Sequence, residues 1–369
     1  MRLAAVFLVL FLPAAAVPAA WAQARPSPLP YAPPPEFAGD FGKYTPLLRF
    51  EGGKAVRNAA GWNKRRREIL ASWHRMMGAW PPLIQKPALE YLAESQRREN
   101  FTQHRVRLEV APEKRTVPGY LLVPDGRGPF PAVLVVFYEP ETSIGLKREL
   151  LDFAYQLTRR GFVTLSIGTP ESEYYPNKDH VTVQPLSMLA YVAANCYRAL
   201  ANLSAVDPRR VGIIGHSYGG KWAMFASCLY EKFACAVWSD PGIVFDETRP
   251  NVNYWEPWYL GWEAGRTRKE GVPNPDNPRT GPYRQMIASG HDLHELHALM
   301  APRPFLVSGG SEDPPERWKA LNHAIAVNRL LGYTNRVAMT NRPHHTPTPE
   351  SNEQIYRFFQ ACLNPLGPR

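Results

Sequence analysis

The feature that most constrains this chain is a short turn, Gly-His-Ser-Tyr-Gly-Gly at residues 215–220. It lies between an apolar run typical of a buried strand, residues 211–215, and a segment of helical character, residues 219–230. A serine between two such elements sits on a sharp turn, so the glycines on either side are needed where a side chain would not fit. The turn presents the oxygen of Ser217 at a helix N-terminus, where backbone amides stabilise negative charge. The pattern predicts a nucleophilic serine.

A serine attacks readily only when a histidine takes its proton and a carboxylate orients that histidine. On a strand–serine–helix scaffold, the acid and then the histidine follow the serine along the chain. We expect the acid to be Asp313, in the Gly-Gly-Ser-Glu-Asp turn after the apolar run 305–308, and Glu312 stands beside it. Asp240, which ends the run 235–239, is an alternative acid, although Asp-Pro-Gly is also ordinary turn chemistry.

The histidine is expected in the loop Asn-Arg-Pro-His-His-Thr-Pro after the last apolar run. We choose His345 over His344 because His345 directly precedes the Thr-Pro-Thr-Pro-Glu start of a helix. For the oxyanion, we expect the amide of Tyr218 and an amide from the loop that begins at Tyr138.

The wider pattern predicts an α/β fold with a doubly wound, mostly parallel sheet. Short, nearly continuous apolar runs indicate strands buried on both faces, and they lie at residues 131–138, 162–167, 211–215, 235–239, 305–308 and 336–339. Helical segments alternate with them, at residues 146–160, 185–203, 219–230, 316–331 and 349–363. Before this core, we expect an amphipathic helix at residues 61–77 and half-buried strands at residues 105–110 and 120–123.

The N-terminus has a basic start, a short apolar stretch and small residues at a cleavage site, which together indicate a secretory signal peptide at residues 1–24. We therefore expect a periplasmic or secreted protein. Residues 25–100 form a proline-rich lead and packing helix, and residues 101–369 form the catalytic domain. Residues 240–300, rich in proline and tryptophan, are interpreted as a lid or substrate-binding insertion.

The composition excludes several classes of protein. With 44% hydrophobic and 21% charged residues, the chain can bury a large core and is not disordered. A formal net charge of +10 suits acidic partners such as uronic-acid polysaccharides, or serves solubility alone. No basic tract interleaved with aromatics suggests nucleic acid, and beyond the N-terminus no apolar run is long enough for stable membrane insertion. We expect a small-molecule or polysaccharide ester as the substrate.

The remaining candidate ligands do not form a convincing metal site. Histidines at positions 291, 294 and 297 lie on one helical face, but they lack the i, i+4 pair of a zinc protease, so we expect no metal and no cofactor. Four cysteines allow three complete pairings, and buried free thiols are an equal alternative. These cysteines are Cys196, Cys228, Cys235 and Cys362.

The order Ser217, acid, His345 resembles the α/β-hydrolase superfamily over about residues 105–365. The segment from Asp292, D-x-H-E-x-x-A-L-x-A-P-R-P, followed by a strand and Gly-Gly-Ser-Glu-Asp, resembles secreted carbohydrate esterases, namely glucuronoyl esterases and their acetyl-xylan-esterase and dienelactone-hydrolase relatives. In glucuronoyl esterases an arginine follows the serine and a lysine stands four positions after it, both implicated in oxyanion and sugar contacts. Lys221 matches that lysine.

Two positions depart from that family pattern, because Tyr218 replaces the arginine and His216 replaces the usual cysteine. The family also varies in which of two strands carries the acid, so the resemblance keeps both aspartates open. It implies a secreted serine esterase, with tryptophans such as Trp258 stacking on sugar rings or building the insertion's own core. The alternatives are a prolyl-oligopeptidase-like peptidase and a non-catalytic carbohydrate-binding protein.

Overall fold

The structure, a computed structural model, describes residues 29–170 and 183–363. The predicted signal peptide, residues 1–24, lies outside these ranges. The described chain forms one ten-stranded sheet in the order β1-β3-β4-β6-β5-β7-β8-β9-β10, with β2 paired to β3. The strands are β1 (Leu89–Tyr91), β2 (Gln96–Arg97), β3 (Phe101–Ala111), β4 (Arg115–Pro124), β5 (Phe130–Val136), β6 (Val163–Ile167), β7 (Val206–His216), β8 (Cys235–Ser239), β9 (Phe305–Gly309) and β10 (Val337–Asn341).

Strands β5 to β10 pair in parallel, whereas β1 to β4 form an antiparallel edge that joins the rest through β4 and β6. The predicted mostly parallel sheet is therefore confirmed. The α-helices are α1 (Ala59–Met77), α2 (Pro140–Ser143), α3 (Phe153–Arg159), α4 (Pro185–Ala201), α5 (Tyr218–Leu229), α6 (Gly281–Ala288), α7 (His294–Leu299), α8 (Trp318–Leu330) and α9 (Pro349–Leu363).

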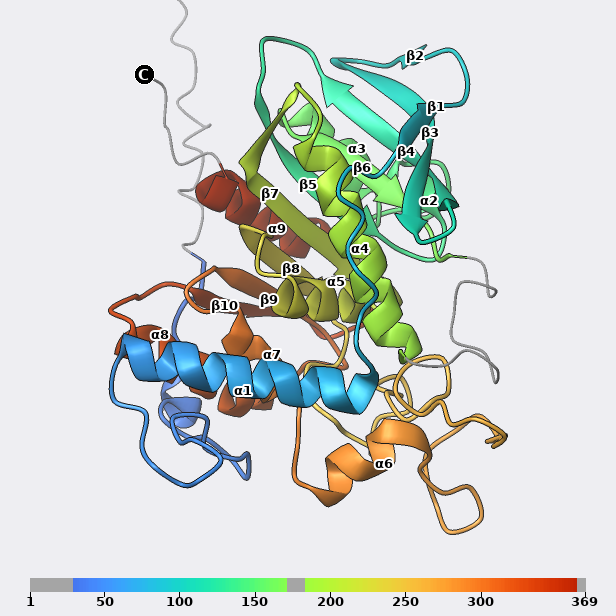
Figure 1. Cartoon of the computed structure of the whole chain (residues 1–369). Helices are drawn as coiled ribbons and strands as arrows, with labels where there is room; N and C mark the ends of the chain where they lie inside the picture. The colour runs from blue at the N-terminus through green and yellow to red at the C-terminus, as the bar shows by residue number, and fades with distance from the viewer. Residues whose placement is uncertain (1–28, 171–182, 364–369) are drawn as a thin grey trace, which may run out of the picture.

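Helices cover both faces of the sheet (Figure 1), and alternate residues of each central strand supply the two cores. In β5, Ala132, Leu134 and Val136 join the core beneath α4 and α5, while Val133 and Val135 join the core beneath α3 and α9. Both faces of these strands are buried, which explains why their sequences are continuously apolar. The active edge of such a sheet is its carboxyl edge, where the strands end and the loops begin.

One predicted helix is shorter than expected. Residues 146–160 were expected to be helical, but only Phe153–Arg159 is, as α3. The preceding stretch contains Gly145 at φ 84° and Leu150 at φ 62°, and these left-handed conformations interrupt a right-handed helix. By contrast, Gly161 and Gly332 take φ 90° and 81° just after α3 and α8, as expected of glycines that end helices.

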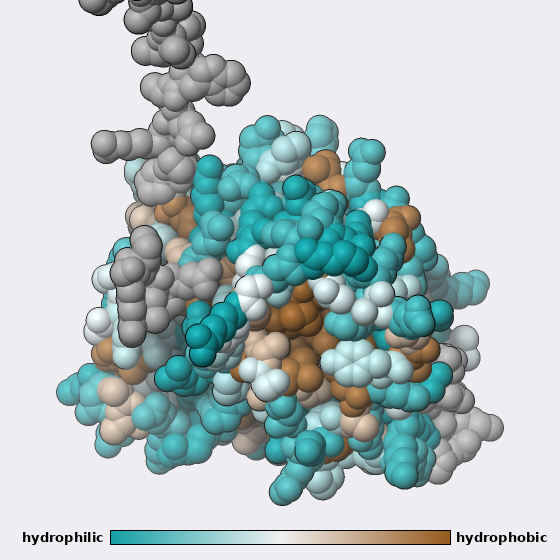
Figure 2. Space-filling model, turned by 90° about the horizontal axis from the view of Figure 1, so that it is seen from above, coloured by the Kyte–Doolittle hydropathy of each residue, from teal (hydrophilic) through white to brown (hydrophobic). Residues whose placement is uncertain are grey.

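One face of the surface shows how hydrophilic and hydrophobic residues are distributed. In the face shown in Figure 2, hydrophilic residues predominate and hydrophobic ones gather in smaller patches. Within residues 29–170 and 183–363, none of the helices combines the length and the apolar character needed to cross a bilayer.

Candidate active site

Ser217 lies on the sharp turn between β7 and α5, with φ 54° and ψ −114°. A non-glycine residue rarely adopts this conformation, and such strain is often found at functional positions. The flanking glycines make the turn possible. A Cβ atom on Gly215 would overlap the carbonyl of Gly219, and one on Gly219 would overlap the carbonyl of Val136. The elbow thus requires both glycines for steric reasons.

The structure places Asp240, not Asp313, against His345. Oδ2 of Asp240 lies 2.7 Å from Nδ1 of His345. Oδ1 of the same carboxylate accepts hydrogen bonds from the backbone amides of Gly310 at 2.6 Å and Asp313 at 2.9 Å. Asp240 is fully buried and has φ 50°, so its own backbone is also in the left-handed region. The contact therefore favours Asp240, the alternative acid of the sequence analysis, over Asp313, which was expected to face the histidine.

Asp313 has a different set of partners. Its carboxylate accepts hydrogen bonds from the amides of Gly242 at 2.9 Å and Ile243 at 2.6 Å, so it fastens the loop that follows β8. Burial and the neighbouring Asp240 raise the pKa of Asp313 to about 7. The other alternative, Glu312, accepts a hydrogen bond from the Asn251 side chain at 3.2 Å and is likewise not directed at the histidine.

The loop that carries His345 is held by residues that sequence reasoning did not single out. The Arg342 guanidinium donates to the carbonyl of His345 at 2.6 Å and to the carbonyl of Ser308 at 2.7 Å, so it ties this loop to β9. Gly310 has no room for a side chain, because a Cβ atom would lie 2.6 Å from Oδ2 of Asp240. Neither role has a local sequence signal, since both depend on chain segments far apart.

His216 also contacts the histidine of the site. The ring centroids of His216 and His345 are 4.6 Å apart, and Nδ1 of His216 lies 3.0 Å from Oγ of Ser239. Burial, helped by His345 and Arg342, holds the pKa of His216 well below its usual range, so its ring is neutral. A neutral neighbour does not repel an imidazolium that forms on His345. The sequence feature that pointed to His216 is its position directly before Ser217.

Two tyrosines stack next to the elbow. The rings of Tyr138 and Tyr218 have centroids 4.5 Å apart and are inclined by only 15°. Tyr138 follows β5 and its side chain is 47% exposed, whereas Tyr218 opens α5 and is buried. Tyr218 follows Ser217 at a helix N-terminus, the usual place for an amide that stabilises an oxyanion. The contribution of Tyr138 to the oxyanion stays a prediction.

The two predicted substrate-binding residues are in different surroundings. Lys221 is buried, and its Nζ donates to the carbonyls of Pro241 at 2.7 Å and Asn251 at 3.1 Å. Burial lowers the pKa of Lys221 to about 8. The ammonium also lies over the rings of Tyr254 and Tyr259, 5.0 and 5.5 Å from their centroids, and its contact with a substrate stays a prediction. Trp258 has 43% of its surface exposed, in contrast to the buried Trp255 nearby, so the insertion uses tryptophan both in its core and on its surface.

The three histidines that were considered as metal ligands have separate partners. His291 pairs with Glu295 at 2.9 Å, and His294 lies 2.9 Å from the carbonyl of Thr45, while the His297 ring packs on Trp238. Among the described residues, no cluster of histidine, cysteine, aspartate and glutamate is arranged to hold a metal ion. All four cysteines are free thiols in the structure.

Buried His294 makes stability depend on pH. Burial and the neighbouring His323 lower the pKa of His294 to about 4. The unfolded chain takes up this proton near pH 6.5, so native stability falls as the pH drops from about 7 to 4, by about 3 kcal/mol for this group. Asp292, whose pKa burial raises to about 7, acts in the opposite sense. Because the two groups partly cancel, the contribution of His294 is measured as the difference in pH dependence between a His294 variant and the wild type.

We expect the free energy of unfolding of His294→Gln, measured by urea titration, to fall less between pH 7 and pH 4.5 than that of the wild type. The expected difference is about 2 kcal/mol. The variant keeps an amide donor for Thr45 but cannot titrate. The exposed His344→Gln is the control and should follow the wild-type profile. Parallel profiles for His294→Gln and wild type would show that His294 does not titrate differently on folding.

Comparisons with known proteins agree with this fold. Residues 193–365 match the Prolyl oligopeptidase family. A glucuronoyl esterase from Solibacter usitatus superposes with a TM-score of 0.67 at 18% identity, covering 87% of this chain and 97% of its own. One from Teredinibacter turnerae gives 0.63 at 21% identity, covering 86% and 89%. One from Sporotrichum thermophile gives 0.59 at 18% identity, covering 88% and 89%.

No curated protein sequence matches the chain. The likeness to the solved structures is one of fold, and it confirms the predicted resemblance to carbohydrate esterases of the α/β-hydrolase superfamily at that level. The chain thus has the fold that serine hydrolases use, with a strained serine at its elbow and a buried aspartate on a histidine at the same edge of the sheet.

Proposed function

We propose that this protein is a secreted serine esterase that hydrolyses carboxylic esters of carbohydrates, glucuronoyl or acetyl esters being the substrate classes. The observation that carries the proposal is the 2.7 Å contact between buried Asp240 and His345, next to the strained elbow of Ser217. An aspartate on Nδ1 leaves Nε2 of His345 as the nitrogen that takes the serine proton.

In the proposed mechanism, Ser217 attacks the ester carbonyl while His345 accepts its proton. The tetrahedral intermediate places its oxyanion near the amide of Tyr218, at the positive end of α5. His345 then protonates the leaving alcohol, and a water molecule, activated by the same histidine, hydrolyses the acyl-enzyme. Asp240 fixes the imidazole tautomer and stabilises the imidazolium. These steps require no metal or organic cofactor.

The substrate class rests on the aromatic surroundings and on the structural relatives. Tyr138 and Trp258 are partly exposed aromatic side chains, a type that suits stacking on a sugar or on an aromatic alcohol. The structural relatives include glucuronoyl esterases. Secretion rests on the N-terminal sequence alone.

A second candidate is a prolyl-oligopeptidase-like peptidase, which the match of residues 193–365 to that family favours. The same residues would then cleave an amide. A non-catalytic carbohydrate-binding protein is the third candidate, but it would have no need of the strained serine and its aspartate–histidine pair.

The test compares esters with amides. Wild-type protein is incubated with p-nitrophenyl acetate, acetylated xylan, methyl glucuronate and a prolyl p-nitroanilide peptide, and a fluorophosphonate probe reports the nucleophile by mass spectrometry. We expect hydrolysis of at least one ester, a rate on the anilide lower by at least about 10²-fold, and labelling at Ser217. Faster anilide cleavage would favour the peptidase, and no turnover with no labelling would favour the binding protein.

A further inference from the structure

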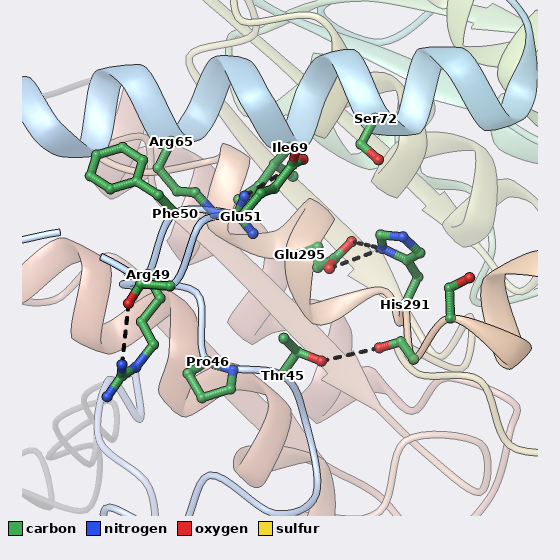
Figure 3. Close-up of a pocket in the computed structure, with 13 residues that line it drawn as sticks. Thr45, Pro46, Arg49, Phe50, Glu51, Arg65, Ile69, Ser72, His291 and Glu295 are labelled. Atoms are coloured by element: carbon green, nitrogen blue, oxygen red, sulfur yellow. Dashed lines mark hydrogen bonds and ion pairs between the residues drawn. The ribbon is translucent and has the colours of Figure 1, made fainter. Parts of the chain in front are cut away.

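A cavity separate from the candidate active site lies under α1. It has a volume of about 320 Å³, opens to the surface, and is lined by α1, the loop around residues 45–53 and the segment 289–295 (Figure 3). None of the candidate active-site residues lines it. A cavity of this size can hold a small ligand such as a monosaccharide.

Arg65 supplies a buried positive charge to this cavity. It reaches down from α1 (Figure 3), with only 7% of its surface exposed. Its Nη1 donates to Glu68 at 3.1 Å, while the exposed Glu51 lies 4.0 Å away. Its Nε has no hydrogen-bond partner among the described residues. Arg65 thus has two carboxylates near it, but its buried Nε donor is unsatisfied, so an acceptor oxygen of a ligand beside it would be favoured.

The opposite wall presents His291, which is held in place by a rigid acid. Glu295 accepts a hydrogen bond from Nε1 of Trp73 at 2.7 Å and lies 2.9 Å from Nδ1 of His291. This contact raises the pKa of His291. Glu295 keeps its negative charge in these contacts, so a ligand carboxylate is favoured at Arg65 rather than at this wall. Arg49, at the rim, donates to the carbonyl of Gly53 at 3.3 Å and adds a second guanidinium.

The rest of the lining combines apolar faces with hydroxyl groups. Phe50, Pro46 and Ile69 supply the apolar surface, and Ser72 and Ser289 supply hydroxyls. A pyranose ring is complementary to this lining, since its C–H faces pack on apolar groups and its hydroxyls donate and accept hydrogen bonds. A carboxylate on that ring would meet the guanidinium groups.

We propose that this cavity is an accessory site for the pyranose ring of a uronic acid, with its carboxylate on Arg65 and its ring against Phe50. The choice of a uronate rests in part on the proposed esterase function, whereas the cavity and its charges do not. The site would hold a uronate-containing polysaccharide on the enzyme without taking part in the hydrolysis.

The test uses a reporter inside the cavity. The Ile69 δ1 methyl group is observed by NMR in the full chain carrying Ser217→Ala, assigned with an Ile69→Val variant, during titration with D-glucuronate. We expect a saturable shift, a Kd at least about 10-fold higher for methyl xyloside, and no saturable shift with inorganic phosphate. Arg65→Gln should raise the glucuronate Kd at least about 10-fold, while the exposed Arg67→Gln on the same helix should leave it unchanged.

If Arg65→Gln does not fold, Ser72→Phe provides the same test, because it fills the cavity while keeping Arg65 and should abolish the shift. An Ile69 shift that does not saturate with glucuronate, or one equally affected by Arg65→Gln and Arg67→Gln, would overturn the proposal. Equal binding of phosphate and glucuronate would overturn its saccharide part. A wild-type protein that binds glucuronate at Ile69 but hydrolyses no ester would defeat the proposed function and leave this site standing.

Discussion

Replacing Ser217 with alanine is expected to reduce ester hydrolysis by about 10⁴-fold or more. The variant removes the only atom that can form the acyl-enzyme in the proposed mechanism, while the oxyanion donors and the binding surface remain. Initial rates with p-nitrophenyl acetate measure the effect. The alanine retains the backbone strain of φ 54° at the elbow, so the melting temperature should change little.

The matched control is Ser95→Ala, which removes the hydroxyl of an exposed serine between β1 and β2 and should keep full activity. The result would contradict the proposal if Ser217→Ala kept more than about a tenth of the wild-type rate with normal stability, because a triad nucleophile cannot be dispensable.

The second large effect concerns the acid. We expect Asp240→Asn to lower kcat by about 10³- to 10⁴-fold, because an asparagine on Nδ1 of His345 no longer fixes the reactive tautomer or balances the imidazolium. Asp240 contacts His345 at 2.7 Å, whereas Asp313 binds backbone amides of the loop after β8. Asp313→Asn should therefore keep most of the activity and mainly lower the melting temperature.

Both variants place an asparagine at a buried position, so they control for one another. Steady-state kinetics and thermal unfolding are measured on both. If Asp313→Asn lost more activity than Asp240→Asn at equal stability, then the acid would be Asp313 and the contact with Asp240 would not operate in catalysis.

Much of the fold was predictable because the central strands are buried on both faces and their sequences show it. β8 (Cys235–Ser239) and α9 (Pro349–Leu363) have the predicted bounds. The short edge strand β2 (Gln96–Arg97) is exposed and polar, and it exists because β3 offers it a partner. Such a strand leaves no periodic pattern in its sequence.

The acid could not be chosen from sequence for a related reason. The spacing identified two strand ends that carry aspartates, but the direction of a carboxylate depends on the backbone that carries it. Asp240 turns toward His345 from a left-handed φ of 50°, and Gly310, from another strand end, leaves room for it. Arg342 was not identified for the same reason, and the contact of His216 could not be foreseen, since their partners Ser308 and Ser239 come from other strands.

The bond between Lys221 and the insertion has a consequence for how substrates enter. One ammonium group on the elbow helix holds the carbonyls of Pro241 and Asn251, and the Tyr254 hydroxyl donates to the carbonyl of Gly242 at 2.8 Å. Swinging this stretch outward would strand a buried cation without acceptors, at a cost of several kcal/mol. Residues 241–254 therefore act as a fixed wall beside the elbow helix, so under the proposed function a substrate would enter past a rigid surface and not under a moving one.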